Sequence, residues 1–287
     1  MVARRIGAYL LPGDPVWLQK TLRQYYDIVD VLVMPIPVSG RGWSGSVIPV
    51  HQVEELARSV DSRGILRVVE GDWVDPENPM QADTAQRRSA LAALEAEGVD
   101  WVIQLDNDEF LPDKDALLAV LDDAERLGAD AVEWPMRVLY RRTASHVFEV
   151  VARDGGPCYE YPGPVAVRPT AELVNARRAA GDVLRVTVRG DERSLQLRRP
   201  PDPGEHRLAA IDHDQAIIHN TWARSPRRIR AKLRSWGHSG DFPRTFYYWA
   251  IWWPAPLTWR LLRDFHPFSR GVWPRLVRRK SAGALAD

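Results

Sequence analysis

The sequence predicts an α/β fold with a mixed, mostly parallel sheet flanked by helices. Short apolar runs alternate with helix-like segments through the first half of the chain, which is the pattern of parallel strands joined by crossover helices. One of these runs, 101–105, breaks abruptly into charged residues, as a buried strand does when it ends at a binding site. The 287 residues, 45% hydrophobic and 27% charged, suffice for one large globular domain or two modest ones.

The expected strands of the first half are short apolar runs. They are residues 5–11, 29–34, 66–70 and 101–105. The segments between them, 15–26, 49–62 and 79–97, are expected to be helices. Pro79 at the start of the third helix and Gly98 just past its end are typical boundary residues. The predicted order is therefore β-α-β-α-β-α-β.

The second half of the chain is less regular. Residues 113–127 show an amphipathic helical pattern that stops at Gly128, and residues 131–140 are expected to form the next strand. Glycine and proline clusters mark loops between 143 and 212, where only 183–188 is expected to be a strand. A short strand is expected at 216–219. Ser225 and Pro226 then begin a basic helix that is expected to run to about Trp236.

The overall charge is balanced, with 39 Lys and Arg against 38 Asp and Glu, which argues against a nucleic-acid partner. The charges are nevertheless segregated. Acids exceed bases by about a dozen in 70–130, and bases exceed acids by about a dozen in 223–280. Such opposed fields suit an anionic ligand held through a metal ion, and solvent-exposed charged faces are the alternative explanation. The single cysteine, Cys158, and the short apolar run near the N-terminus predict a cytoplasmic location.

The most specific pattern is the apolar run 101–105 followed by Asp-Asn-Asp-Glu at 106–109. In an extended chain alternate side chains share a side, so Asp106 and Asp108 would face the same way. Two carboxylates this close repel each other unless they share a proton or bind a cation, and oxygen ligands favour magnesium, manganese or calcium. The alternative is a surface turn, because Asp and Asn are common turn residues and Pro112 follows closely.

Two segments carry a resemblance to a known family. Residues 88–91 (Arg-Ser-Ala-Leu) and 105–111 (Leu-Asp-Asn-Asp-Glu-Phe-Leu) together resemble family-2-type glycosyltransferases of the GT-A fold, whose signature is an Asp-x-Asp closing the fourth strand. Residues 219–225 (His-Asn-Thr-Trp-Ala-Arg-Ser), with Lys232, are similar to a His…Arg-Ser…Lys signature in a bacterial subgroup with the Asp-x-Asp-Glu motif. The likeness extends over about 5–241 and is strongest at 86–111.

The resemblance implies a division of the chain and an activity. Residues 1–222 would form the GT-A domain, with a donor half of about 1–112 and an acceptor half of about 113–222. Residues 223–287 would be a basic, aromatic, helical C-terminal extension. The implied activity is metal-dependent transfer of a sugar from a nucleoside-diphosphate-sugar donor to an unidentified glycan, lipid-linked or small-molecule acceptor. Inversion at the sugar is expected, and retention is the alternative, because the motif does not decide between them.

The resemblance also implies roles for particular residues. A divalent cation, Mn²⁺ or Mg²⁺, would bridge the two donor phosphates, with Asp106, Asp108 and His219 as its ligands. Alternatively, His219 is a core residue, which is common for a lone histidine after an apolar run. The residues expected to contact the donor are Leu11, Asp72, Arg88, Asp106, Asn107 and Lys232. Arg87 is expected to be exposed, and the glycine-rich insert at 40–45 to be a mobile flap without an assigned role.

An inverting transfer requires a base that takes the proton from the acceptor hydroxyl. Glu160 is the preferred candidate, because its aromatic neighbours Tyr159 and Tyr161 would partly remove it from water and raise its basicity. Asp214 or Asp212, just before the last predicted strand, is the alternative. Each of these acids could instead be a loop carboxylate paired with an arginine.

Residues 246–253 are Phe-Tyr-Tyr-Trp-Ala-Ile-Trp-Trp, and basic residues follow as far as Lys280. Aromatic side chains beside cations are typical of a membrane interface, so one interpretation is a peripheral contact with the inner membrane leaflet. The other is that aromatic helices pack over the sheet. No apolar stretch reaches the roughly 20 residues needed to span a bilayer.

Two alternative functions remain open. A sugar nucleotidyltransferase has a similar sheet, but a glycine- and arginine-rich phosphate loop would normally follow its first strand. Residues 10–14, Leu-Leu-Pro-Gly-Asp, lack such a loop. A peripheral membrane or scaffold protein with a non-catalytic GT-A-like domain would use the acidic cluster only as a structural feature.

Overall fold

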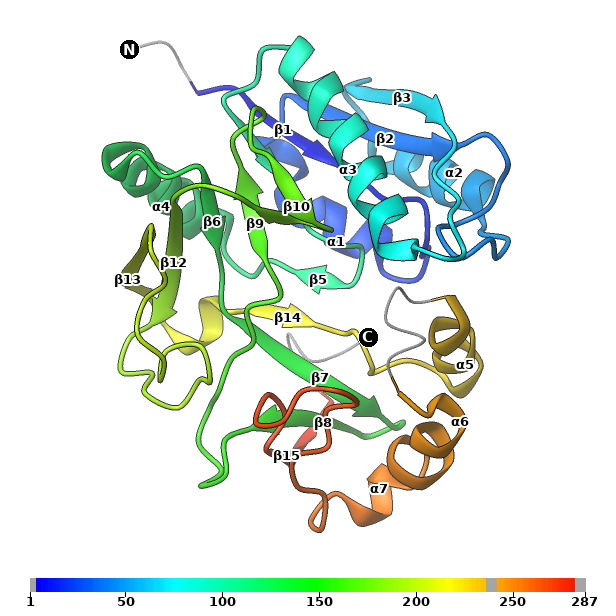
Figure 1. The fold of residues 1–287 in the computed structure, drawn as a ribbon, viewed down its shortest axis with the longest axis vertical. Helices are drawn as coiled ribbons and strands as arrows, with labels where there is room; N and C mark the ends of the chain where they lie inside the picture. The colour runs from blue at the N-terminus through cyan, green and yellow to red at the C-terminus, as the bar shows by residue number, and fades with distance from the viewer. Residues whose placement is uncertain (1–3, 236–241, 282–287) are drawn as a thin grey trace.

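A computed structural model describes residues 4–235 and 242–281. The larger sheet has eight strands in the order β13-β12-β6-β9-β4-β1-β2-β3 (Figure 1). These strands are β1 Ile6–Tyr9, β2 Val31–Pro37, β3 Leu66–Gly71, β4 Trp101–Ile103, β6 Ala131–Glu133, β9 Pro164–Val167, β12 Val183–Val188 and β13 Glu205–Ile211. All neighbours are parallel except at β9, which runs antiparallel to β4 and β6. The predicted fold class, a mixed and mostly parallel sheet, is confirmed.

Four helices follow the predicted segments and cover the two faces of this sheet. They are α1 Leu18–Tyr25, α2 Val50–Val60, α3 Pro79–Ala96 and α4 Lys114–Leu127. One hydrophobic cluster joins Leu22, Val53 and Leu117, from α1, α2 and α4, to one face. Leu91 and Leu94 of α3 belong to a cluster on the other face. Strands β1, β2 and β4 are buried along their whole length, as expected for parallel strands with helices on both sides.

The smaller sheet has five strands in the order β15-β8-β7-β14-β5. They are β5 Glu109–Phe110, β7 Met136–Arg142, β8 His146–Val151, β14 Ile217–His219 and β15 Arg275–Lys280. The strand expected at 131–140 is therefore two strands, β6 and β7, separated by Trp134 and Pro135. Because proline cannot donate to a strand ladder, the chain leaves the larger sheet here and continues in the smaller one.

In the described part of residues 223–287, helices come first and a strand follows. The helices are α5 Pro226–Ser235, α6 Arg244–Phe246, the π-helix η3 Tyr247–Trp252 and α7 Ala255–Thr258. The expected end of α5 at Trp236 lies outside the described residues. Strand β15 is an unexpected element, and it pairs antiparallel with β8. Aromatic side chains attach this segment to the smaller sheet, since the ring of Tyr140 lies 4.8 Å from Phe265 and 5.5 Å from Trp273, measured between centroids.

Three shorter elements complete the fold. They are the 3₁₀-helices η1 Tyr26–Ile28 and η2 His213–Gln215, and a small hairpin of β10 Leu173–Asn175 and β11 Arg178–Ala179. The hairpin contacts α3, and the carbonyl of Arg177 in its turn accepts a hydrogen bond from Gln104 Nε2, just after β4, at 2.9 Å. Within the two described ranges, no helix is long and apolar enough to cross a membrane.

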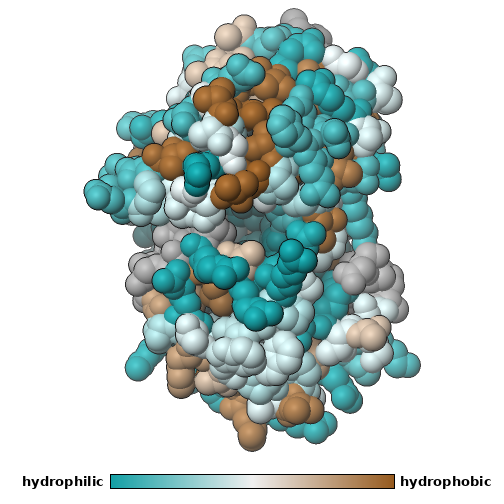
Figure 2. All heavy atoms as spheres, turned by 90° about the vertical axis from the view of Figure 1, so that its right-hand side faces the viewer, coloured by the Kyte–Doolittle hydropathy of each residue, from teal (hydrophilic) through white to brown (hydrophobic). Residues whose placement is uncertain are grey.

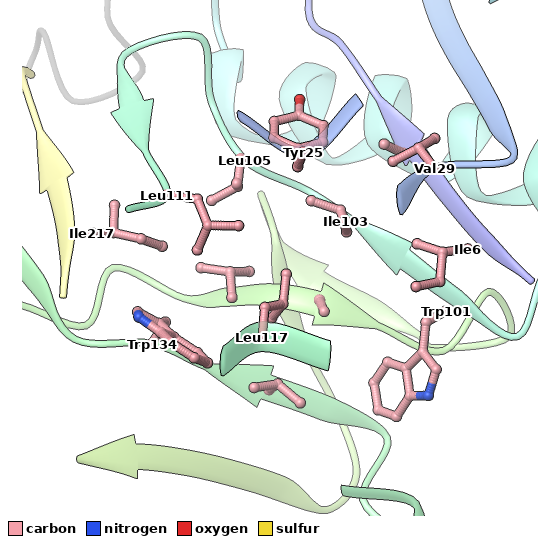
Figure 3. Close-up of a cluster of buried hydrophobic side chains, with 14 of the residues drawn as sticks. Ile6, Tyr25, Val29, Trp101, Ile103, Leu105, Leu111, Leu117, Trp134 and Ile217 are labelled. Carbon is pink, nitrogen blue, oxygen red and sulfur yellow. The ribbon is translucent and has the colours of Figure 1, made fainter. Parts of the chain in front are cut away.

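Both ends of the acidic segment are anchored in the main core. Leu105 precedes the segment and Leu111 follows it, and each is only 2% exposed. Figure 3 shows their side chains near Ile217 of β14, in the cluster that also contains Trp134. The acidic residues therefore connect β4 of the larger sheet to β5 of the smaller one, at the junction of the two sheets.

Candidate active site

The acidic segment is a buried turn. Strand β4 ends at Ile103, and the carbonyl of Asp106 accepts a hydrogen bond from the backbone nitrogen of Glu109 at 3.0 Å. The prediction of an extended chain through Asp106 and Asp108 is therefore wrong, and the alternative prediction of a turn is confirmed. The turn does not lie on the surface, however, because Asp108 is 6% exposed and Glu109 is fully buried.

Asp106 faces a buried arginine from α3. Arg87 Nη2 lies 3.0 Å from Asp106 Oδ1, and Arg87 Nε donates to Asp83 at 2.7 Å. Burial alone would raise the pKa of Asp106, but the charges of Arg87 and Arg177 outweigh it and hold this pKa at about 2. The expectation that Arg87 is exposed is wrong, since it is only 3% exposed.

Glu109 forms a two-pronged ion pair with Arg177. Both of its carboxylate oxygens accept hydrogen bonds from Arg177 at 2.7 Å, and one also accepts from the backbone nitrogen of Asp106 at 3.0 Å. Arg177 sits in the turn between β10 and β11, after Ala176, whose φ is 48°. A Cβ atom on Gly163 would lie 3.1 Å from Arg177 Cγ, so this glycine leaves room for the arginine. Glu109 thus anchors the turn.

Asp108 and His219 approach each other across the smaller sheet. His219 is paired with Glu109 in the β14–β5 register, and its Nε2 lies 3.9 Å from Asp108 Oδ1 and 3.8 Å from Glu109 Oε1. Burial and the nearby Lys232 lower the pKa of His219, so the imidazole is neutral. Its Nδ1 is buried without a hydrogen-bond partner among the described residues.

The carboxylate of Asp108 is held in a mixed electrostatic environment. Burial raises its pKa, as do the like charges of Asp106 and Glu109, whereas Lys232 opposes the rise. The guanidinium of Arg224 contacts the same carboxylate and favours its ionised form. An ionised carboxylate so far removed from water is strongly drawn to any cation that can reach it.

The chemistry of Asp108 and His219 fits a divalent cation. An anionic oxygen and a neutral imidazole nitrogen 3.9 Å apart can both reach one ion at about 2.0–2.2 Å each. Within the described ranges, no three His, Cys, Asp or Glu side chains form a complete metal cluster. Asp106, the third predicted ligand, also lines the cavity and pairs with Arg87 through its Oδ1. Further oxygens, from a diphosphate or from water, would therefore have to complete the coordination shell.

These groups open onto a cavity of about 570 Å³ between the two sheets. Seven of the predicted site residues line it: Leu11, Asp106, Asn107, Asp108, Glu160, His219 and Lys232. Asn107 Nδ2 donates to the carbonyls of Leu11 at 3.0 Å and Asp14 at 2.8 Å, which ties the loop after β1 to the acidic turn. Burial and Arg224 lower the pKa of Lys232 to about 8, against the nearby carboxylates.

Three predicted site residues are not among the described residues that line this cavity. Asp72 is exposed and accepts a hydrogen bond from Ser39 Oγ at 2.6 Å. Arg88 Nε donates to the carbonyl of Leu173 at 3.0 Å. Asp214 is an exposed residue of η2. The alternative acid Asp212 is also exposed, and it pairs with Arg189 at 2.9 Å.

Glu160 and the glycine-rich insert both reach the cavity. Glu160 Oε2 accepts a hydrogen bond from Trp273 Nε1 at 3.1 Å, and its backbone pairs with Met136. Trp43, within 40–45, lines the cavity and donates to Gln86 Oε1 at 2.7 Å. The insert therefore belongs to the wall that the cavity shares with α3.

The main residues missed from the sequence are three arginines. Arg87 could have been found from its spacing, because Asp83 lies four residues earlier on the same helix face. Arg224 lies inside the segment 219–225, but the resemblance implies roles only for His219 and Lys232. Arg177 carries no local signal, since only the folded hairpin brings it to Glu109.

No family model matches this sequence, and no curated protein matches it. Solved structures with partial similarity include a 4-diphosphocytidyl-2C-methyl-D-erythritol synthase from Anaerococcus prevotii, at 14% identity and a TM-score of 0.34 over 58% of this chain and 70% of that one. Another such synthase has 13% identity and a TM-score of 0.35, over 61% and 83%. A mannose-1-phosphate geranyltransferase from Thermus thermophilus has 12% identity and a TM-score of 0.30, over 59% and 51%. TM-scores this low assign neither a family nor a function.

Proposed function

We propose that this protein is a metal-dependent glycosyltransferase that uses a nucleoside-diphosphate-sugar donor. The observation that carries the proposal is a convergence. Asp108 of the acidic turn, and His219 and Lys232 of a segment more than 100 residues later, line one cavity. The carboxylate and the imidazole suit a divalent cation, and the lysine beside them suits a phosphate.

The proposed chemistry follows from the charges around this cavity. When the bond to the sugar breaks, negative charge grows on the diphosphate, and a bound Mn²⁺ or Mg²⁺ supplies Lewis-acid stabilisation. Asp108 and His219 would hold the ion. Lys232 would donate to a phosphate oxygen, and Arg224 would keep Asp108 ionised until the ion binds. Glu160 is the proposed base, because it lines the cavity and Asp214 does not.

Donor turnover tests this proposal directly. Purified protein with Mn²⁺ and a panel of uridine, guanosine and thymidine diphosphate sugars should release nucleoside diphosphate from at least one of them. Asp108→Asn and His219→Ala should reduce the rate at least 100-fold. Asp115→Asn is the matched control, because Asp115 is an exposed residue of α4 and is not among the residues that line the cavity. The proposal fails if no donor is turned over with any acceptor offered, or if Asp108→Asn retains the wild-type rate.

A sugar nucleotidyltransferase is the second candidate, because the same cavity could hold a nucleoside triphosphate and a sugar phosphate. In its favour, two cationic residues, Lys232 and Arg228, line the cavity together with the acidic turn. Against it, the loop after β1 has one glycine and no arginine between residues 10 and 14. Release of pyrophosphate from a nucleoside triphosphate plus a sugar 1-phosphate would favour this candidate over glycosyl transfer.

We further propose that the C-terminal helices touch an anionic membrane surface, on the cytoplasmic side. Five large apolar residues along α6, η3 and the segment from α7 onward are exposed: Phe246 by 64%, Trp249 by 56%, Trp253 by 45%, Leu257 by 89% and Leu261 by 80%. They recur every three or four residues along this stretch, and together they define the exposed apolar face of the C-terminal segment. Figure 2 shows hydrophobic side chains at the lower end of the molecule, where α7 lies in Figure 1.

The charges around this face indicate which kind of surface it fits. Between Phe242 and Arg263 the sequence contains no Asp or Glu, and it carries Arg244, Arg260 and Arg263. Exposed aromatic and leucine side chains with flanking arginines match the interface of an anionic bilayer.

Vesicle flotation tests this contact. The protein should float with phosphatidylglycerol vesicles but not with phosphatidylcholine vesicles. The combined variant Trp249→Ser, Trp253→Ser and Leu257→Ser should stay at the bottom of the gradient. Val47→Ser, which alters an apolar residue that is 78% exposed on the opposite half of the fold, should float like the wild type. Flotation of the triple variant would contradict the contact. If the triple variant lost its cellular function while Asp108→Asn kept it, the alternative of a non-catalytic peripheral membrane protein would be favoured.

A further inference from the structure

A second cavity, of about 610 Å³, lies beside the first and shares Arg224 and Arg228 with it. Three segments form its walls. They are the residues around the start of α1, the turn between β7 and β8, and the segment that leads into α5. The two cavities are therefore separated by the stretch that carries Arg224.

The described lining of this second cavity is strongly basic. Five of its twelve residues are cationic, namely Lys20, Arg141, Arg142, Arg224 and Arg228, and none is acidic. Arg224 and Arg228 share the carboxylate of Asp14. The guanidinium of Arg141 instead donates to the backbone carbonyl of Arg142 at 2.8 Å. Cations gathered in a hollow raise the local concentration of anions.

Arg141 is held in place on a rigid aromatic support. Its guanidinium carbon lies 4.2 Å from the ring centroid of Trp252, which is fully buried and donates to the carbonyls of Tyr140 and Trp222. Its Nε is buried with no hydrogen-bond partner among the residues described. Burial lowers the pKa of Arg141, so the charged form gains from any anion that approaches. A stacked, fixed guanidinium is well suited to bind phosphate oxygens.

The start of α5 adds to the positive potential. Ser225 and Pro226 line the cavity, and Pro226 is the first residue of this ten-residue helix. Backbone N–H groups of the first helical turn have no partner within the helix, and the helix dipole is positive at this end. The helix dipole, the hydroxyl of Ser225 and the basic side chains therefore all favour an anion in the second cavity.

We propose that the second cavity binds a phosphoryl group, and that this group belongs to the acceptor substrate. The anion site follows from the lining alone, whereas its assignment to an acceptor rests on the proposed glycosyl transfer. Arg224 touches Asp108 on one side and lines the second cavity on the other, so an acceptor anchored here would lie next to the proposed donor site. Acceptors that carry a phosphate would then be preferred over their neutral counterparts.

Calorimetric titration with inorganic phosphate and pyrophosphate, in EDTA, tests the anion site. Lys20→Gln and Arg141→Gln should each weaken binding at least fivefold. Arg58→Gln, at an exposed arginine of α2 paired with Glu54, should leave it unchanged. Lys20 is exposed, so its variant should fold even if loss of the Arg141 stack disturbs η3. The site would be overturned if Lys20→Gln and a folded Arg141→Gln both bound phosphate as tightly as the wild type does. It would also be overturned if the wild-type protein bound neither phosphate nor pyrophosphate.

Two further titrations separate this site from the proposed function. Binding of uridine, guanosine or thymidine diphosphate with Mn²⁺ should be lost in Asp108→Asn and retained in Lys20→Gln, while phosphate binding in EDTA should show the opposite pattern. If no nucleotide binds but phosphate still does, the glycosyltransferase proposal fails and the anion site stands.

Matched acceptor pairs test the assignment to the acceptor. Donor turnover should be faster with glycerol 3-phosphate than with glycerol, and faster with glucose 6-phosphate than with glucose. The preference should appear as a lower KM and should disappear in Lys20→Gln. Equal turnover within both pairs would overturn the acceptor assignment and leave a phosphate site of another kind.

Discussion

At the residue scale, the candidate site depends on buried ion pairs that hold its carboxylates apart. Glu109 is fully buried and Arg177 is 4% exposed, so neither charge can turn to water if the other is removed. Breaking a buried pair by deleting one partner typically destabilises a protein by about 3–5 kcal/mol. The pair between Arg177 and Glu109 is therefore a structural requirement for placing Asp106 and Asp108.

Arg177→Met should lower the free energy of unfolding by about 3–5 kcal/mol, because it leaves the Glu109 carboxylate buried and uncompensated. Urea denaturation monitored by tryptophan fluorescence measures this loss. Glu54→Gln is the control, since it removes an exposed pair with Arg58 at four-residue spacing and should change stability by less than about 0.5 kcal/mol. Similar losses in the two variants would contradict the role given to Arg177.

A substitution at Gly163 tests how precisely Arg177 must be positioned against Glu109. Its φ of 142° is accessible almost only to glycine, and a Cβ atom would lie 3.1 Å from Arg177 Cγ. Gly163→Ala should therefore lose about 1–3 kcal/mol of stability and also weaken binding of Mn²⁺ with nucleoside diphosphate, because Arg177 must shift. Gly190→Ala shares the positive φ but faces open space, so it should lose about 1–2 kcal/mol from backbone strain alone and should bind normally. Unchanged ligand binding in Gly163→Ala would show that Arg177 tolerates the shift.

Sequence patterns identified the acidic residues but not their partners, for a physical reason. The cluster at 106–109 is visible because its neighbours along the chain are apolar. Arg177 is distant in sequence and lies in a two-residue turn, where its neighbours carry no periodicity. Which of Arg87 and Arg88 is buried beside the acidic turn depends on the rotation of α3 about its axis. The ion pair with Asp83 shows that the buried arginine is Arg87.

At the element scale, segments with strong local signals lie where they are predicted. Helix α4 has Asp113 as its N-cap, which accepts a hydrogen bond from the backbone nitrogen of Ala116, and Gly128 with φ 69° at its end. Strand β15, Arg-Leu-Val-Arg-Arg-Lys, has no such signal. Its charged composition is that of an exposed edge, and pairing with β8 makes it a strand. The split of β6 from β7 likewise depends on which sheet each half joins.

A three-strand charge cluster predicts how the smaller sheet responds to acid. Glu149 on β8 pairs with Arg137 on β7 at 2.7 Å and also contacts Arg279 on β15. Burial would raise the pKa of Glu149, but the two arginines outweigh it and the pKa is lowered below its usual value of 4.5. The lowered pKa means that this stabilisation is present above pH 4.5 and is lost as the pH falls through the folded-state pKa.

Glu149→Gln should therefore be less stable than the wild type at pH 7, and the difference should shrink as the pH falls below about 4.5. Thermal unfolding at a series of pH values measures both effects. Glu54→Gln again serves as the control, with a small and nearly constant difference. A difference between wild type and Glu149→Gln that grows in acid would contradict the assigned sign.

At the scale of the whole molecule, the candidate site lies where two sheets are joined. The acidic turn links β4 of the larger sheet to β5 of the smaller one, and His219 and Lys232 come from β14 and α5. A ligand that bridges the carboxylate side and the lysine side must therefore contact both halves of the fold. Binding at such a junction stabilises the arrangement of the halves as well as the local side chains.

Ligand binding should consequently stabilise both sheets together. Mn²⁺ with the nucleoside diphosphate of the preferred donor, at about 100 times its Kd, should add about 2.7 kcal/mol to the free energy of unfolding. Hydrogen exchange should slow in β1 and β4 of the larger sheet and in β7 and β14 of the smaller one. In Asp108→Asn neither sheet should gain protection, whereas Asp115→Asn, at an exposed residue of α4, should behave like the wild type. Protection confined to one sheet would mean that the ligand does not span the junction, and the assignment of His219 and Lys232 to the same site as Asp108 would fail.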